Sequence, residues 1–321
     1  MYNKIKRNRK KFIFNIKDLN AIKNYNKIFK DIQINDVSTI KNPINHSLIF
    51  TKNWSKEIEN MLLNINHSLI IIKKHERETN NNIIKNNECI FVDNPRLEYA
   101  VILNYILSKQ PKKDRYYKEL KNRVIIGENV NIGKGTKIEP FVFIDHDVQI
   151  GDNCILKAGV RICSNVLIGN YTVIGQNSVI GGPGFGIEKN INGMFIKIPH
   201  VGGVIIGNNV EIYSQCAVNS GTIEPTVIED NVMIGNLVII GHNNIIKRGC
   251  IIVGGSNVGG SVTIGKESYL GINCSIKNGL TIGENVLIGM GAVVRKSTKD
   301  NVVVAGKAAK QFPKPIDYQI S

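Results

Sequence analysis

The 321-residue chain has no long apolar run, few aromatic residues and few acids. No hydrophobic stretch approaches the roughly 20 residues that a membrane-spanning helix needs, so the sequence predicts no membrane span. The apolar residues 12–14, behind a basic start, are too few for a signal peptide, and we expect a cytoplasmic protein. The six cysteines include no CxxC pair, which argues against a disulfide framework and favours structural thiols.

Acidic residues number 26 against 41 lysines and arginines, which gives a net charge of +15. The basic residues crowd positions 1–30 and 109–123. Neither stretch carries a recognition motif or many interleaved aromatic residues, so we expect no nucleic-acid partner. Attraction of small substrates that carry phosphate explains the charge better.

An aliphatic residue returns at every sixth position over most of residues 124–294. Ten steps run without a break from Ile126 to Ile180, and after two interruptions the same phase continues to Val294. A mostly small or β-branched residue stands two positions earlier, and glycine often follows. A period of six fits neither an α-helix nor a simple alternating strand, but it fits a short strand plus a tight turn, repeated.

Three such units close a triangular coil of 18 residues, and strands of successive coils then pair about 4.8 Å apart. The aliphatic side chains stack inside, while glycine and asparagine take the turn positions. This is the pattern of the hexapeptide-repeat β-helix, whose known examples coil left-handed, against the usual crossover rule. The sequence therefore predicts a mainly β protein, a left-handed parallel β-helix with a small N-terminal α/β domain.

The repeat is absent from residues 12–120, where strand and helix patterns alternate. We expect strands at 47–50, 69–72 and 88–93, and helices at 16–29, 55–63 and 96–107. Alternation of this kind implies a small α/β domain. The predicted organisation is an N-terminal α/β domain (1–107), a linker (108–123), the β-helix (124–300) and a C-terminal tail (301–321).

The two interruptions of the coil fall at residues 181–203 and 219–226. The first reads GGPGFGIEKNINGMFIKIPHVGG, which is rich in glycine and contains aromatic residues. Loops on a rigid scaffold are where functional sites are usually built, so we expect the site beside this segment.

Several stretches resemble the N-acyltransferases that act on nucleotide-linked amino sugars, and most closely the UDP-3-O-acylglucosamine N-acyltransferases of lipid A synthesis. The matching stretches are GGPGFG (181–186), KIPHVGGVIIGNNVEI (197–212) and VIIGHNN (238–244). That family's N-terminal sugar-nucleotide domain is similar to DVSTIKNPINHSLIFTKN (36–53) and FVDNPRLEYA (91–100), in the same order. The resemblance implies that residues 1–107 bind a nucleotide sugar and that the chain is an acyltransferase.

The family takes its general base from the histidine matched here by His242. Imidazole suits this role because it titrates near neutral pH and can accept the proton of an attacking amine. One coil has 18 residues, so Gly260 stacks on His242. The family's backbone N–H at that position is the oxyanion donor, and a glycine leaves it open to a thioester. A surface histidine and an ordinary turn glycine are the alternatives.

Five further residues are implied in substrate binding. His200 and Phe185 lie in the first interruption, with which the family shapes its sugar and acyl pocket. Phe50 matches an aromatic residue that brackets the nucleotide base, and Asn53 matches a family asparagine. Trp54 is close to a second aromatic position without being in register. A solvated His200 and a core Trp54 remain the alternatives.

Three departures from the lipid A pattern bear on the substrates. Gly235 and Asn236 replace an Asp–Asn pair, and we keep Asn236 as a substrate-binding candidate. Ser220 stands where an arginine is expected. The long C-terminal helical extension, associated in the family with the acyl carrier protein, is missing.

The end of the chain instead resembles the closing motif of CoA-dependent hexapeptide acetyltransferases. That resemblance implies contacts between the CoA phosphates and Arg295, Lys307 and Lys310. We therefore expect direct transfer from acyl-CoA to the amine of an amino-deoxyhexose on a dTDP or UDP carrier. The alternative is UDP-3-O-acylglucosamine N-acyltransferase activity with an acyl carrier protein donor, and a non-catalytic scaffold is a third interpretation.

No permanently bound cofactor is expected. No metal site is expected either, because His146, His200 and His242 lack the close spacing of zinc ligands. A convex prism offers no deep cleft of its own. We therefore expect a homotrimer in which each site lies between two neighbours.

Overall fold

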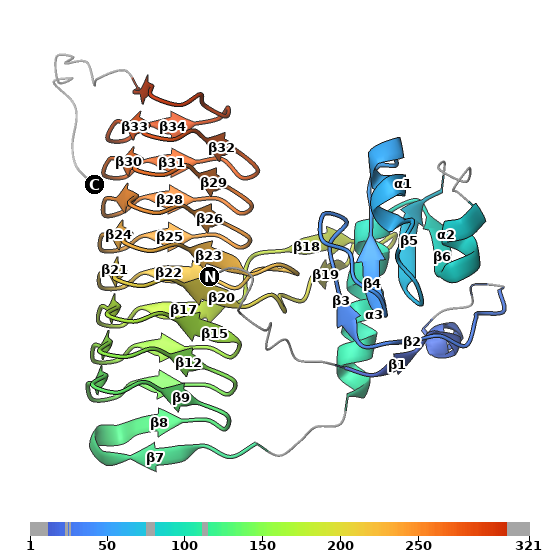
Figure 1. Ribbon diagram of the computed structural model, residues 1–321, viewed down its shortest axis with the longest axis horizontal. Helices are drawn as coiled ribbons and strands as arrows, with labels where there is room; N and C mark the ends of the chain where they lie inside the picture. The colour runs from blue at the N-terminus through green and yellow to red at the C-terminus, as the bar shows by residue number, and fades with distance from the viewer. Residues whose placement is uncertain (1–11, 23–24, 26, 75–80, 111–114, 307–321) are drawn as a thin grey trace, which may run out of the picture.

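The computed structural model describes residues 12–22, 25, 27–74, 81–110 and 115–306. A long three-sided coil stands beside a small α/β domain (Figure 1). Among the residues described, no helix combines the length and the hydropathy needed to cross a bilayer.

The coil has three faces, and the coil strands within each face are parallel. Face 1 contains β8 (Val124–Ile126), β11 (Phe143–Ile144), β14 (Arg161–Ile162), β17 (Val179–Gly182), β22 (Ala217–Asn219), β25 (Ile239–Ile240), β28 (Asn257–Val258), β31 (Ser275–Ile276) and β34 (Val293–Val294). Face 2 contains β9 (Asn131–Ile132), β12 (Gln149–Ile150), β15 (Val166–Ile168), β20 (Val204–Ile206), β23 (Thr226–Ile228), β26 (Ile245–Ile246), β29 (Thr263–Ile264) and β32 (Thr281–Ile282).

Face 3 contains β10 (Lys137–Ile138), β13 (Ile155–Leu156), β16 (Val173–Ile174), β21 (Glu211–Ile212), β24 (Met233–Ile234), β27 (Ile251–Ile252), β30 (Tyr269–Leu270), β33 (Leu287–Ile288) and β35 (Val303–Val304). Before the first coil, β7 (Lys118–Leu120) pairs antiparallel with β8, and the 3-10 turn η3 (Lys121–Arg123) joins the two strands. The predicted β-helix is confirmed.

The register of the coil is the predicted one. Ile144 pairs with Ile162, 18 positions later, and this spacing recurs along the face. The inward aliphatic residues form one buried core that runs along the coil. Cys154 and Cys250 are buried in it, and each thiol donates a hydrogen bond to a backbone carbonyl at 3.0 Å, as expected of structural cysteines.

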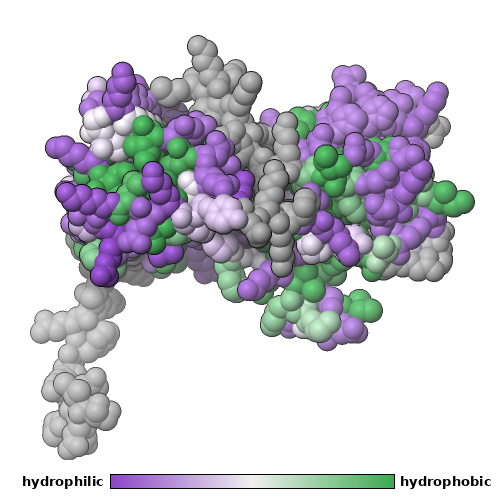
Figure 2. All heavy atoms as spheres, turned by 90° about the horizontal axis from the view of Figure 1, so that it is seen from below, coloured by the Kyte–Doolittle hydropathy of each residue, from purple (hydrophilic) through white to green (hydrophobic). Residues whose placement is uncertain are grey.

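The first coil is the exception, because among the described strands only β7 pairs beneath it, and only on face 1. Ile132 carries the core phase yet is 38% exposed, and Ile126 and Ile138 are only partly buried. Viewed from this end, hydrophobic atoms lie in the middle of the left-hand lobe and hydrophilic atoms surround them (Figure 2).

The N-terminal domain is built on a parallel sheet of β3 (Asp36–Val37), β4 (Ser47–Phe50), β5 (Leu69–Lys73) and β6 (Glu88–Val92). Its helices are α1 (Lys56–Leu62), α2 (Asn81–Asn86) and α3 (Pro95–Lys109). The three predicted strands and two of the three predicted helices are present. Strand β3 and helix α2 were not predicted.

The helix predicted at 16–29 is wrong. Among the described residues of this segment only a 3-10 helix, η2 (Ile16–Ala21), forms, between the antiparallel partners β1 (Phe14–Asn15) and β2 (Gln33–Ile34). The Asn15 side chain accepts from Lys17 N–H, and Asn20 donates to the carbonyl of Lys27. Asparagine side chains that bond the local backbone in this way compete with a regular helix.

Both interruptions leave the coil at the edge between faces 1 and 2 and reach the N-terminal domain. The first contains an antiparallel hairpin, β18 (Ile187–Lys189) and β19 (Phe195–Lys197), which extends toward α3 (Figure 1). Glu188 of this hairpin pairs with Arg96 at 2.6 Å and accepts from Asn94 at 3.1 Å. The hairpin and the N-terminal domain are therefore held together by charge as well as by apolar packing.

Candidate active site

The edge between faces 1 and 2 brings the two predicted catalytic residues together. His242 lies in the turn from β25 to β26, and Gly260 occupies the same turn one coil later. A Cβ atom placed on Gly260 would lie only 2.6 Å from His242 Nε2, so the imidazole rests directly against this glycine. The predicted stacking of positions 242 and 260 is therefore present.

Asn243 determines which nitrogen of His242 carries the proton. Its Oδ1 accepts from Thr222 N–H at 3.2 Å and from the Thr222 hydroxyl at 2.9 Å, and its Nδ2 donates to the carbonyl of Glu224 at 3.0 Å. These bonds fix the amide orientation, so His242 Nδ1, 2.8 Å from Oδ1, must be the donor. In the neutral imidazole the lone pair then lies on Nε2, toward Gly260, where it can accept a proton.

The backbone N–H of Gly260 is open. At the same edge in the first coil, the Glu128 N–H donates to the stacked His146 Nδ1 at 2.7 Å, and at the edge between faces 2 and 3 the Lys134 N–H donates to Asp152 at 2.6 Å. Within the described part of the chain, Gly260 N–H donates to no acceptor, and the stacked Asn278 does not reach it. The arrangement offers a free hydrogen-bond donor beside His242 Nε2, which suits a developing oxyanion.

His200 joins His242 at this edge. The centroids of the two rings are 5.1 Å apart and the ring planes are inclined at 64°. Both histidines pack against Gly184, where a Cβ atom would lie 2.7 Å from His200 Nε2 and 2.8 Å from His242 Cβ. Burial, together with the neighbouring His242, lowers the pKa of His200 to about 4, so this imidazole is neutral at pH 7. Its Nε2 is buried and bonds to none of the described residues, which makes it a candidate acceptor for a ligand.

The family described as "Bacterial transferase hexapeptide (six repeats)" matches this chain at residues 129–164, 147–182 and 261–296. Residues 129–182 and 261–296 of the coil are therefore bacterial transferase hexapeptide repeats. The chain is 33% identical over 184 residues to "UDP-3-O-acylglucosamine N-acyltransferase 1" of Francisella tularensis subsp. holarctica (strain OSU18), over 53% of each chain. It is 37% identical over 189 residues to "UDP-3-O-acylglucosamine N-acyltransferase" of Coxiella burnetii (strain Dugway 5J108-111), over 53% of this chain and 54% of the relative.

The chain thus spans about half the length of these curated relatives. Among solved structures, "UDP-N-acetylglucosamine acyltransferase from Campylobacter jejuni" superposes with a TM-score of 0.52 at 24% identity. The superposition covers 58% of this chain and 70% of that one. It supports the fold of the hexapeptide coil.

The other predicted residues lie in several places around the hexapeptide coil. Phe185 lies between Gly184 and Gly186, which both contact His200, and it is 85% exposed. Asn236 is at a different edge, between faces 3 and 1, where its Oδ1 accepts from Ser214 N–H at 3.0 Å. The structure therefore gives Asn236 a turn-capping role and does not bring it to His242.

Arg295 is exposed on the edge that carries His242, three coils further along, in the turn after β34. Lys307 and Lys310 lie outside the described residues. The predicted CoA contacts are thus placed for Arg295 alone.

The three predicted nucleotide-binding residues lie at or just beyond the carboxyl end of β4. This is the edge at which open parallel sheets usually bind ligands. The Phe50 ring is half-buried, 4.8 Å from the Tyr99 ring, and Trp54 packs against a second apolar cluster, while Asn53 is exposed. Both aromatic rings therefore have packing roles, and base stacking by them stays a prediction.

Sequence reasoning did not assign roles to Asn243, Thr222 or Glu224. The Asn243 signal was available, because this residue adjoins His242 in the motif. No sequence signal pointed to Thr222 and Glu224, because the second interruption contacts Asn243 only in the folded coil.

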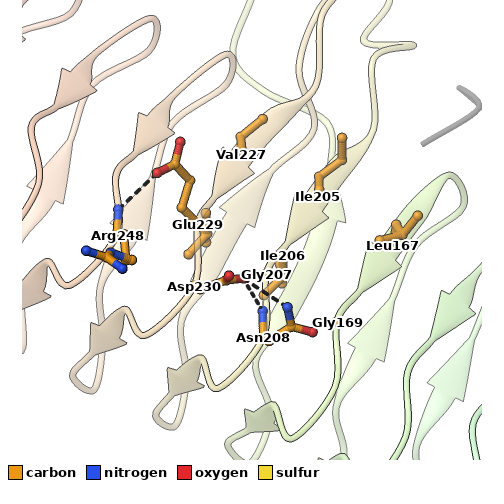
Figure 3. A pocket seen from close by; sticks show the side chains of 11 residues that line it. Leu167, Gly169, Ile205, Ile206, Gly207, Asn208, Val227, Glu229, Asp230 and Arg248 are labelled. Carbon is orange, nitrogen blue, oxygen red and sulfur yellow. Dashed lines mark hydrogen bonds between the residues drawn. The ribbon is translucent and has the colours of Figure 1, made fainter. Parts of the chain in front are cut away.

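A cavity of about 400 Å³ on face 2 was also missed. Its floor consists of Leu167, Ile205 and Val227, which project from neighbouring strands on the same side (Figure 3). Polar residues line its rim: Asn208, Glu229, Asp230 and Arg248. The sequence signal is a second apolar residue beside the inward one, as in Leu167-Ile168, on three successive strands of this face.

Proposed function

We propose that this chain transfers an acyl group from a thioester to the amine of a nucleotide-linked amino sugar, with His242 as general base. The observation that supports it is that His242 Nε2 and the open N–H of Gly260 lie against each other at one edge of the coil. Successive coils are about 4.8 Å apart. His242 can therefore reach the attacking amine while the Gly260 N–H reaches the oxygen of the thioester carbonyl.

In this mechanism the amine attacks the thioester carbonyl while His242 Nε2 takes one amine proton. The Gly260 N–H stabilises the negative charge on the carbonyl oxygen, and the Asn243 carbonyl stabilises the imidazolium through Nδ1–H. The tetrahedral intermediate then collapses: the C–S bond breaks and the departing sulfur receives the proton from His242. No covalent enzyme intermediate is needed.

The names of the relatives favour UDP-3-O-acylglucosamine as the acceptor over the amino-deoxyhexose expected from the sequence departures. In this proposal the N-terminal domain holds the nucleotide near Phe50, Asn53 and Trp54. The buried Nε2 of His200 would accept a hydrogen bond from a sugar hydroxyl or amine beside the reacting nitrogen.

The donor would be acyl-CoA or an acyl carrier protein. Arg295 supports a phosphate-bearing donor, because it stands three coils, or about 14 Å, from His242 along the same edge. The apolar floor of the face 2 cavity supports an acyl chain longer than acetyl, since β23 of this floor pairs with β26, which begins three residues after His242.

A homotrimer remains part of the proposal. Outward apolar residues on the upper part of face 3 are exposed, as expected of a face that pairs with a second copy: Met233, Ile251, Tyr269, Leu287 and Val303. Sedimentation tests this directly, and a fully active monomer would exclude sites shared between neighbours.

The amino-deoxyhexose acceptor is kept as a second candidate because of Ser220. Its hydroxyl accepts from Gly203 N–H at 3.0 Å, so this position is committed to joining the two interruptions and offers no cation to the substrate. The lipid A pattern has an arginine there.

A donor-by-acceptor panel tests the proposal. Purified protein is incubated with acyl-CoA or acyl carrier protein thioesters, and with UDP-3-O-acylglucosamine or UDP- and dTDP-linked amino-deoxyhexoses, and products are identified by mass. We expect N-acylated sugar, and a loss of turnover of about 100-fold or more in His242→Ala with little change in KM. Absence of product in every pairing would favour the scaffold interpretation. Near-normal turnover of His242→Ala would exclude His242 as the general base.

A further inference from the structure

The second interruption connects the N-terminal domain to the histidine pair. Ile223, at the tip of this loop, is only 4% exposed and lies in the apolar cluster of the N-terminal domain. The cluster includes Leu48 and Ile102 from that domain, and Ile198 from the first interruption. A side chain from the coil thus completes the core of the neighbouring domain.

The two neighbours of Ile223 are the residues that hold Asn243. Thr222 donates twice to Asn243 Oδ1, and the Glu224 carbonyl accepts from Asn243 Nδ2. The Glu224 carboxylate in turn accepts from the hydroxyl of Thr39, just after β3, at 3.3 Å. Every bond that orients the Asn243 amide, other than its bond to His242, therefore comes from the loop that Ile223 anchors.

The loop has little freedom to compensate for a lost anchor. Gly221 N–H donates to Gly203 at 3.0 Å, and a Cβ on Gly221 would lie 1.8 Å from the Glu224 carbonyl oxygen. The chain is thus folded tightly back on itself between two fixed points. Movement of Ile223 is transmitted to Thr222 and Glu224 because few backbone torsions separate them.

We propose that Ile223 is a positioning residue, through which the N-terminal domain orients Asn243 and so selects the tautomer of His242. If the Asn243 amide turned over, its NH₂ would face His242 Nδ1, which would then have to accept. The proton would move to Nε2, and the lone pair needed for the amine would be lost. The kinetic part of this inference rests on the proposed function, whereas the tautomer part does not.

The test compares Ile223→Ala with Ile106→Ala and Ile223→Val. Ile106 is fully buried in the same cluster but lies on α3, away in sequence from the Asn243-holding loop, so its truncation controls for lost packing. Melting temperature, kcat and KM are measured for each. Protein labelled with ¹⁵N-histidine reports the tautomer, with the His242 signal assigned from a His242→Gln spectrum.

We expect both alanine variants to lower the melting temperature, and Ile223→Ala alone to lower kcat, by about 10- to 100-fold, because displacements of 1 Å can cost about that much. The acceptor KM should stay within about 2-fold, and the His242 signal should shift toward the Nε2–H form. The kcat of Ile223→Val should lie between that of the wild type and that of Ile223→Ala, and below that of Ile106→Val. If Ile223→Ala does not fold, Ile223→Val is compared with Ile106→Val in the same way.

Equal kcat in Ile223→Ala and Ile106→Ala, or an unchanged Nδ1–H tautomer in Ile223→Ala, would overturn the inference. A tautomer shift in a protein that acylates none of the tested sugars would instead support the positioning role and count against the proposed function.

Discussion

Replacing Gly260 by alanine tests the geometry of the site with a single methyl group. Its Cβ would lie 2.6 Å from His242 Nε2 and 2.7 Å from Cε1. Favourable contacts between such atoms begin near 3.5 Å, so the imidazole must move by about 1 Å. The methyl group would also crowd the open N–H of Gly260.

The expected result is a fall in kcat of about 100-fold, equivalent to about 2.7 kcal/mol of transition-state stabilisation. The backbone of Gly260 is not in the left-handed region, so alanine adds no torsional strain, and the free energy of unfolding should change by only about 1 kcal/mol. Steady-state kinetics and thermal melting measure the two quantities separately.

Gly289→Ala is the matched control. It is another turn glycine outside the left-handed region, and its added Cβ would meet the Ala305 Cβ at 3.3 Å, far along the coil from His242. We expect its kcat to stay near that of the wild type. A Gly260→Ala enzyme as active as Gly289→Ala would refute the assignment of Gly260 and His242 to one reaction centre.

Two more predictions follow from His200 and from the cavity. Burial lowers the pKa of His200 from 6.5 to about 4, so the unfolded chain binds more protons between these values and stability should fall as pH drops from about 6.5 to 4. His200→Gln should show a smaller drop in melting temperature between pH 7 and pH 5 than the wild type, and an equal drop would contradict the burial of this imidazole. Val227→Trp should fill the face 2 cavity and lower kcat/KM for long acyl donors more than for acetyl donors. Gln149→Trp, on the same face outside the cavity, is its control. If Val227→Trp left the preference for acyl-chain length unchanged, this cavity would be excluded as the binding site of the acyl chain.

The coil could be predicted from sequence because its interactions are periodic. Each inward residue stacks on the one 18 positions away, so the spacing alone placed Gly260 on His242 before any contact was known. The same argument located the interruptions as gaps in the phase. Prediction succeeded where neighbours in space are related by a fixed offset in sequence.

The supports of the site follow no such offset. Glu188 meets Arg96, and Ile223 enters a cluster formed mostly by residues more than a hundred positions earlier. Nothing in the local sequence of 220–225 distinguishes a docking loop from a solvated turn. The roles of Phe50 and Trp54 were uncertain for the same reason, since packing against Tyr99 or an apolar cluster is decided by the tertiary fold.

The location of both interruptions at one edge has a physical reason that bears on how the site works. Face 2 continues in register across them, because Ile168 pairs with Ile206, and Ile206 with Ile228. Face 2 therefore tolerates long insertions at this edge without losing its pairing or core stacking, and on face 1 the register shifts only between Ile180 and Gly182. His242 and Gly260 stay fixed by the coil, while His200, Thr222 and Glu224 are supplied by segments whose outer ends belong to the N-terminal domain. The chemistry stays on the rigid coil and the second interruption orients Asn243, whereas the first interruption carries His200. Acceptor preference should therefore follow the first interruption, and turnover should follow the coil together with the second interruption.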